Sequence, residues 1–388
     1  MNVSAPITLL QPSRIVFGAD CIGAVAELLA ARQTRRLALI TTARGLAQAQ
    51  RFCTNLRDAG AEVVPFTEVP AEPPLGAFEQ LRTALDRDNV DAVLGWGGGS
   101  VLDVAKLLAA LHRSDTATRD VIGIGRLDRR ALPLVCVPTT AGTGSEVSPN
   151  SILLDEEARL KVGVISPHLV PDAAVIDPQL TVSAPPALTA TTGIDALVHC
   201  LEAFANRHAH PLVDLYALEG LRLIATHLPT AVRDGHNLAA RTAVARGSLY
   251  GGLCLGPVNT AAVHALAYPL GSAFHVPHGL ANALLLPHVL RFNLPAALER
   301  YAAVARALGV TSNGPRSPQA EAEAGLLRLE QLLDDCAVPR RLREFGVSQS
   351  DIPALVSGAM QVTRLLCNNP REVSPADATA IYEAALAA

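Results

Sequence analysis

Asp91-Ala-Val-Leu-Gly-Trp96 is followed directly by Gly97-Gly-Gly-Ser100 and then by the apolar segment Val101–His112. A short continuous apolar run is typical of a strand buried in a parallel sheet. The spacing of Val, Leu and Ala after the glycines predicts a helix. This stretch therefore predicts a strand, a glycine-rich turn and a helix in direct succession.

The same alternation occurs on both sides of this stretch. Apolar runs predict further strands at 14–18, 37–42, 62–66 and 132–137. Apolar residues at helical spacing predict helices at 21–31, from 43 to about 59, and at 78–87. Strands that alternate with helices form βαβ units, so we expect an α/β domain built on a parallel sheet.

The pattern changes after Ala184-Pro-Pro186, where Ala and Leu at helical spacing dominate to the end of the chain. A length of 388 residues is consistent with two domains. We therefore expect an α/β domain over residues 1–184 and an all-helical domain over residues 185–388. The stretch Ser312–Ser317 is expected to be an exposed loop between helices.

Composition excludes several classes of protein. The chain is 49% hydrophobic, carries a net charge of −4 and has only 4% aromatic residues, which argues against a nucleic-acid partner. Seven cysteines without a C-x-x-C pair favour reduced thiols over a disulfide framework. We find no signal peptide and no run of eighteen apolar residues, and so expect a cytoplasmic protein with no membrane partner.

Polar residues with the chemistry of metal ligands stand out in the helical half. Asp195 and His199 are four residues apart, which places them on one face of a helix. Glu202 lies on that face too and could steady a ligand from behind. His264 and His278 follow farther along the chain. One carboxylate and three imidazoles without thiolates suit a divalent ion such as Fe²⁺ or Zn²⁺.

His278 follows His264 after fourteen positions in the chain, and Pro269 and Pro277 both lie between the two histidines. We expect both prolines to break the intervening helix. His278 would then return toward His264 from a loop or from the start of a helix.

Two glycine-rich stretches are candidates for binding phosphate. Gly97–Ser100 joins a predicted strand to a helix, and Pro138-Thr-Thr-Ala-Gly-Thr-Gly-Ser-Glu146 follows another predicted strand. Backbone N–H groups at such turns bind the pyrophosphate of dinucleotides. Neither has the G-x-G-x-x-G pattern, so an ordinary strand–helix turn is the alternative. From the residues alone, Lys106 and Lys161 are expected to be surface charges, and Asp103 to interact with a helix start.

Together these motifs resemble the iron-containing (group III) alcohol dehydrogenases of the dehydroquinate synthase-like superfamily. The resemblance covers almost the whole chain and rests on Gly97–Lys106, Pro138–Glu146, Gly193–His199 and the His264 and Pro277–Asn282 motifs, with Asn369-Pro-Arg371 near the end. It implies a nucleotide-binding α/β domain, a helical domain, an active-site cleft between them and a homodimer or larger homo-oligomer.

The resemblance also implies roles for individual residues. It implies Asp195, His199, His264 and His278 as the Fe²⁺ ligands and catalytic residues. The residues expected at NAD or NADP are Thr42, Gly97, Gly98, Gly99, Ser100, Asp103, Thr139, Thr140, Thr143, Ser145 and Lys161. Asn150 and Tyr268 are expected near the substrate.

Three positions depart from the family pattern. Tyr268 stands where members often have a second histidine that relays protons, and a tyrosine shuttles protons poorly at neutral pH. His275 is a possible stand-in for that histidine. Thr42 stands where NAD-preferring members have an aspartate, and Arg44 is close by, which leaves both NAD and NADP open. Glu72 replaces an asparagine near the adenosine side.

We therefore expect a metal-dependent NAD(P) oxidoreductase that interconverts a small alcohol and its aldehyde or ketone. The closest alternative is a metal-independent enzyme like the maleylacetate reductases, against which the complete ligand set argues. A lyase such as a dehydroquinate synthase would need a basic pocket that the helical half does not suggest. A non-catalytic binding protein on the same fold is favoured only by Tyr268.

Overall fold

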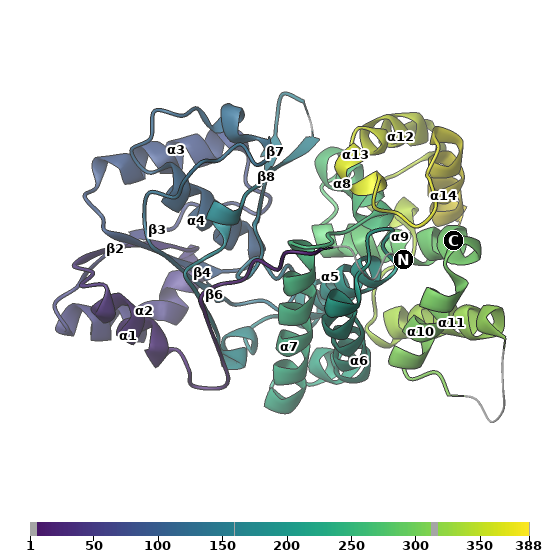
Figure 1. The fold of residues 1–388 in the computed structure, drawn as a ribbon, viewed down its shortest axis with the longest axis horizontal. Helices are drawn as coiled ribbons and strands as arrows, with labels where there is room; N and C mark the ends of the chain where they lie inside the picture. Colours follow the sequence, from purple (N-terminus) through teal and green to yellow (C-terminus); the bar gives the residue numbers. More distant parts are fainter. Residues whose placement is uncertain (1–5, 159, 312–316, 388) are drawn as a thin grey trace. The chain divides into compact units, whose positions relative to one another are not determined.

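The computed structural model describes residues 6–158, 160–311 and 317–387. Their contacts divide the chain into two compact units. Among the described residues, 10–140 and 144–183 form an α/β unit. Residues 6–9, residues 141–143 and the described residues from 184 onward form a helical unit. Figure 1 shows the elements of each unit.

The α/β unit is built on a parallel sheet. Its six strands in the described residues have the order β1-β9-β6-β4-β2-β3, and a smaller sheet has the order β5-β8-β7. The strands are β1 (Arg14–Phe17), β2 (Arg36–Ile40), β3 (Glu62–Phe66), β4 (Ala92–Gly97), β5 (Gly123–Ile124), β6 (Leu134–Pro138), β7 (Asn150–Asp155), β8 (Leu160–Ile165) and β9 (Ala173–Ile176).

Helices cover both faces of the larger sheet. They are α1 (Gly23–Ala31), α2 (Ala43–Asp58), α3 (Leu75–Arg87) and α4 (Gly99–Leu111), with short 3₁₀ helices η1 (Thr118–Val121), η2 (Pro167–Leu169) and η3 (Pro178–Thr181). Leu37 and Leu39 of β2 pack in the core with Phe52 of α2, whereas Ala38 and Ile40 pack in a second core with Leu102 of α4. Alternate residues thus face opposite sides, which explains the continuous apolar runs.

The helical unit contains the helices that follow residue 185. They are α5 (Pro186–Phe204), α6 (Pro211–Arg233), α7 (Leu238–Leu255), α8 (Ala262–Phe274), α9 (His278–Asn293), α10 (Leu298–Ala307), α11 (Pro318–Asp335), α12 (Ile352–Met360), α13 (Thr363–Leu366) and α14 (Pro375–Ala387), with 3₁₀ helices η4 (Leu294–Ala296), η5 (Leu342–Phe345) and η6 (Gln349–Asp351). Every residue of α5 from Gly193 to Phe204 is buried. Polar side chains on this segment are therefore kept away from water.

The predicted fold class is confirmed, and the first strands and helices lie within a few residues of their expected bounds. The sequence analysis missed β5, β7, β8 and β9, which are short or belong to the smaller sheet. The prediction that Pro269 breaks its helix is wrong, because Pro269 lies inside α8. Burial of Ala262–Gly271 offsets the one backbone hydrogen bond that the proline cannot donate.

Two further expectations concern loops and membranes. Of the expected loop Ser312–Ser317, residues 312–316 lie outside the described residues, and Ser317 caps α11 by accepting a hydrogen bond from Ala320 N–H. Among the described helices, none combines the length and the apolar character needed to cross a membrane.

Candidate metal centre and nucleotide-binding loops

The central helix α5 presents Asp195 and His199 on one buried face. His199 Nε2 lies 3.8 Å from Asp195 Oδ1, and the two residues are 2% and 5% exposed. The four-residue spacing produces this proximity because one helical turn returns to the same face. This geometry is consistent with the expectation that both side chains bind one metal ion.

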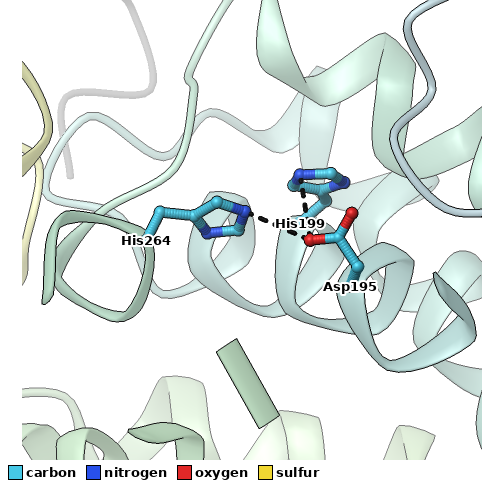
Figure 2. Close-up of side chains that lie close together, drawn as sticks. All are labelled: Asp195, His199 and His264. Carbon is cyan, nitrogen blue, oxygen red and sulfur yellow. Dashed lines mark ion pairs between the residues drawn. The ribbon is translucent and has the colours of Figure 1, made fainter. Parts of the chain in front are cut away.

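Helix α8 brings His264 to the same carboxylate. His264 Nε2 lies 3.5 Å from Asp195 Oδ1, and the His264 ring stacks on the His199 ring with centroids 4.7 Å apart. One possible ligand atom from each of Asp195, His199 and His264 lies within 4.8 Å of the other two. Figure 2 shows the two histidines converging on the carboxylate. Such a cluster can hold a metal ion.

His278 completes the set from the first position of α9. Its Nε2 lies 3.5 Å from the same Asp195 Oδ1, and its ring centroid is 5.2 Å from that of His264. The expectation that His278 returns from a helix start agrees with the structure. The four residues predicted as ligands therefore converge on one carboxylate oxygen.

Glu202 contacts the His264 ring at Nδ1, the nitrogen that does not face Asp195. Its Oε2 lies 2.6 Å from His264 Nδ1, and its Oε1 accepts a hydrogen bond of 2.6 Å from Val263 N–H. A carboxylate at Nδ1 keeps the proton on that nitrogen and leaves Nε2 free for a cation. The expected supporting role of Glu202 therefore has a direct structural basis.

The pKa values reflect how closely these charges interact. Burial disfavours the charge on Asp195, but His199, His278 and His264 hold the pKa of its carboxyl well below the usual range. Burial lowers the pKa of His199 to about 4 despite Asp195. Burial also opposes charge on His264, yet hydrogen bonds to Asp195 and Glu202 raise its pKa to about 10. The two carboxylates thus favour the protonated, positively charged form of His264.

Asn282, which the sequence analysis assigned no role, shows that the donor set fits a cation. Its Nδ2 lies 2.7 Å from Asp195 Oδ1, 3.2 Å from His264 Nε2 and 3.4 Å from His278 Nε2. An amide nitrogen has two protons for these three neighbours, and Asn282 Oδ1 is buried without a hydrogen-bond partner among the described residues. Polar atoms of three side chains thus converge on one amide nitrogen. Asn282 could have been found from its position four residues after His278.

The ends of β4 and β6, from which the two glycine-rich loops begin, lie side by side in the α/β unit. Gly97 of β4 is in register with Pro138 of β6, and Thr139 N–H donates to Gly97 O at 2.9 Å. A Cβ on Gly97 would approach Val101 to 2.7 Å, and a Cβ on Gly98 would lie 3.3 Å from Thr140 Oγ1. Both loops thus lie at the carboxyl ends of adjacent strands, where α/β sheets bind nucleotides. Gly99 and Ser100 begin α4, whose N-terminal dipole favours a phosphate.

Lys106 and Asp103 attach the second loop to α4. Lys106 is fully buried and donates to Ser145 O at 3.0 Å, to Ser148 O at 3.3 Å and to Asn150 O. Asp103 accepts hydrogen bonds from Ser145 Oγ–H and from Ile152 N–H. The expectation of a surface charge at Lys106 is therefore wrong, since the carbonyl groups of the loop surround its ammonium. Asp103 likewise binds this loop rather than capping its helix.

Lys161 and Glu72 form an ion pair beside the first loop. Lys161 Nζ lies 2.7 Å from Glu72 Oε1, and the Lys161 side chain is only 7% exposed. Glu72 N–H donates to Ser100 Oγ at 3.3 Å, and Glu72 adopts a positive φ of 50°. The expectation that Lys161 is a solvated surface residue is therefore wrong.

The remaining predicted residues are placed as follows. Thr42 caps α2 by accepting a hydrogen bond from Gly45 N–H, and Thr143 lies in the segment grouped with the helical unit. Asn150 Oδ1 is buried and has no hydrogen-bond partner among the described residues. Tyr268 is 6% exposed, and its ring centroid lies 5.9 Å from that of His278.

Comparison with known proteins identifies the family. Residues 12–178 match the family model described as iron-containing alcohol dehydrogenase, and residues 189–386 match its C-terminal counterpart. A long-chain-alcohol dehydrogenase 1 of Geobacillus thermodenitrificans is 42% identical over 339 residues, which are 86% of this chain and 84% of that protein.

Solved structures agree with the sequence matches. A 1,3-propanediol oxidoreductase has a TM-score of 0.93 at 33% identity, covering 98% of this chain and 100% of that chain. A sulfoacetaldehyde reductase from Bifidobacterium kashiwanohense in complex with NAD⁺ has a TM-score of 0.88 at 28% identity, covering 98% and 99% of the two chains. The resemblance and the oxidoreductase class predicted from the sequence are confirmed, and the chain belongs to the iron-containing alcohol dehydrogenase family.

Proposed function

We propose that this protein transfers a hydride between an alcohol and NAD(P), with Fe²⁺ bound by Asp195, His199, His264 and His278. One observation carries the proposal: the Nε2 atoms of three histidines lie 3.8, 3.5 and 3.5 Å from a single oxygen of the buried Asp195. A buried carboxylate surrounded by three imidazoles is a donor set for a divalent ion of intermediate softness.

The protein residues would prepare this set for the ion. Asp195 supplies the negative charge, and Glu202 fixes the orientation of His264 through Nδ1. Asn282 would rotate or shift its amide as the cation replaces its Nδ2 among the ligand atoms. When bound, the ion supplies a Lewis acid that polarises a substrate carbonyl. Fe²⁺ is the choice supported by the family, with Zn²⁺ as the alternative that the same ligands accept.

The α/β unit would bind the nucleotide. The N–H groups at Gly98–Ser100 and the hydroxyls of Thr139 and Thr140 are suited to the pyrophosphate. The cofactor supplies the chemistry of hydride transfer when it is bound. The end of β2 carries Thr42 in place of a carboxylate, which supports the use of NADP as well as NAD.

The direct test is reduction of simple aldehydes, followed by the absorbance of NADH and NADPH, on protein of known metal content. We expect chelation to abolish turnover and Fe²⁺ to restore it. Full activity of metal-free protein would favour the maleylacetate reductase-like alternative. Failure of the iron-loaded protein to turn over any aldehyde would favour a non-catalytic binding protein.

A further inference from the structure

Arg364 is a partly buried cation close to the predicted metal ligands. It lies on α13, whose Leu365 packs in one apolar cluster with Ala265 and Tyr268 of α8. The Arg364 guanidinium donates a hydrogen bond from Nη2 to the Tyr268 hydroxyl at 3.1 Å. Its Cζ lies 5.8 Å from the centroid of the Tyr268 ring. Packing of α13 on α8 thus determines where this guanidinium lies.

Tyr268 connects Arg364 to the metal ligands. The centroid of its ring lies 5.9 Å from the centroid of the His278 ring, and His278 Nε2 is 3.5 Å from Asp195 Oδ1. A single aromatic side chain therefore separates the guanidinium from a proposed ligand. A substrate whose oxygen lies at the ligands would have to extend past Tyr268 to bring its other end to Arg364.

Arg364 has no carboxylate partner in the part of the chain that the structure describes. Among the described residues it forms no ion pair within 4.0 Å, and its hydrogen bond to Tyr268 is the only one that its guanidinium makes. Arg300 in the same unit, by contrast, binds Asp214 through both terminal nitrogens, at 2.6 and 2.7 Å. A guanidinium presents five donors in a planar fork that matches an oxyanion. Removing one from water without such a partner is unfavourable, so a ligand that supplies an oxyanion would gain affinity.

We propose that Arg364 binds an acidic group of the substrate, and that the preferred substrates are short alcohols and aldehydes with an oxyanion at the end opposite the reacting carbon. A carboxylate, a sulfonate and a phosphonate share this chemistry. Tyr268 accepts a hydrogen bond from the guanidinium and thereby holds its orientation. This inference rests on the function proposed above.

The test compares two four-carbon aldehydes that differ only in the acidic group, namely succinic semialdehyde and butanal. We expect the wild-type protein to show a higher kcat/KM for succinic semialdehyde. Arg364→Gln should lower that kcat/KM by about 10- to 100-fold, mainly through KM, because a charge-assisted contact is lost. Its kcat/KM for butanal should change by less than about threefold.

Controls separate recognition from structural damage. Arg364→Lys should retain part of the preference, and Arg291→Gln, which removes an exposed arginine paired with Glu330 at 3.0 Å, should retain all of it. Metal content and Tm should be unchanged in each variant. A wild-type protein without preference, or an equal loss for both aldehydes in Arg364→Gln, would overturn the proposal.

A binding measurement keeps this test independent of turnover. Calorimetric titration of the NADH-loaded, iron-loaded protein with 4-hydroxybutyrate, a pairing that cannot react because both partners are reduced, should show tighter binding than titration with 1-butanol, and Arg364→Gln should remove the difference. Equal binding of the two alcohols by the wild type would overturn the inference. Absence of turnover with both aldehydes, despite selective binding, would instead count against the proposed oxidoreductase reaction.

Discussion

Glu202 acts on the proposed metal site through His264, so its contribution can be tested without changing a proposed ligand. It is buried and accepts hydrogen bonds from His264 Nδ1 and Val263 N–H, but none of its atoms is among the proposed ligands. Glutamine has nearly the same shape and lacks the charge. The substitution therefore changes the electrostatics of His264 without opening a cavity.

We expect Glu202→Gln to weaken metal binding by about 10- to 100-fold, the usual effect of removing a carboxylate behind a ligating histidine. Competition with a chelating dye would measure the affinity. Glu219→Gln is the matched control, since Glu219 pairs with Arg222 on the surface of α6. Unchanged affinity in Glu202→Gln would show that Glu202 serves packing alone.

Thr42 offers a clean test of cofactor choice. Its side chain caps α2 through Gly45 N–H, and aspartate caps a helix at least as well as threonine. Thr42→Asp should therefore leave the fold intact while adding a charge that repels a 2′-phosphate. We expect kcat/KM for NADPH to fall by about tenfold or more relative to NADH. Parallel losses for both cofactors would place the 2′-position elsewhere.

Glu146 makes the stability of the α/β unit depend on pH. The residue is buried, and burial raises the pKa of its carboxyl to about 7, against the lowering effects of a backbone hydrogen bond and of Lys106. The folded state therefore retains this proton at pH values where the unfolded chain has released it. Stability consequently falls as pH rises between about 4.5 and 7 and stays reduced above that range.

Glu146→Gln removes this penalty. We expect the variant to be more stable than the wild type at pH 8, by on the order of 3 kcal/mol, and by less than about 1 kcal/mol at pH 5. Urea unfolding at the two pH values measures the difference. Glu79→Gln, at an exposed position of α3, is the control. A variant that is less stable than the wild type at pH 8 would show that the Glu146 charge is favourable.

At the level of secondary structure, the contact between α5 and α9 places two of the proposed ligands. Gly279 follows His278 at the start of α9, and a Cβ built on it would lie 2.2 Å from Thr191 O and 3.2 Å from Asp195 Cβ. The backbone of α9 can approach α5 this closely only with glycine at that position. The Pro277-His278-Gly279 sequence thus has a packing reason for its glycine.

Gly279→Ala should therefore separate the two helices. A backbone carbonyl cannot rotate away from a methyl group, so we expect a loss of about 2 kcal/mol or more in unfolding free energy together with weaker metal binding. Gly23→Ala is the control, because nothing lies within 4 Å of a Cβ at Gly23. Normal stability and metal content in Gly279→Ala would mean that α5 and α9 are not held at this distance.

The elements that the sequence predicted well are those whose own pattern decides their structure. The strand, turn and helix at 91–112 were predicted because a buried parallel strand reads as a continuous apolar run. The two-residue strand β5 carries no such signal. Pro269 was misjudged because burial of α8 outweighs the local preference of proline, and no local pattern reports that burial.

Across the whole molecule, the candidate site was predictable where spacing within one helix brings residues together. Asp195, His199 and Glu202 belong to this class. Lys106 was misjudged because its partners lie about forty residues away along the chain, in the loop after β6. The sequence has only two lysines, at 106 and 161, and both side chains are buried. That scarcity, among many arginines, was the available signal that these two positions are special.

The two units divide the proposed work between them. The α/β unit contains both glycine-rich loops, apart from residues 141–143, and the helical unit contains all four proposed ligands. The whole account depends on one ion bound by residues from α5, α8 and α9. Without this ion, the protein would lack the Lewis acid that the proposed hydride transfer requires.

Anomalous diffraction at the iron edge, from crystals of iron-loaded protein, tests this claim most directly. We predict one strong peak at about 2.0–2.2 Å from an Asp195 oxygen and from Nε2 of His199, His264 and His278. Substitution of Asp195 by asparagine should remove that peak. A peak at other residues, or none in crystals of protein that reduces aldehydes, would contradict the account.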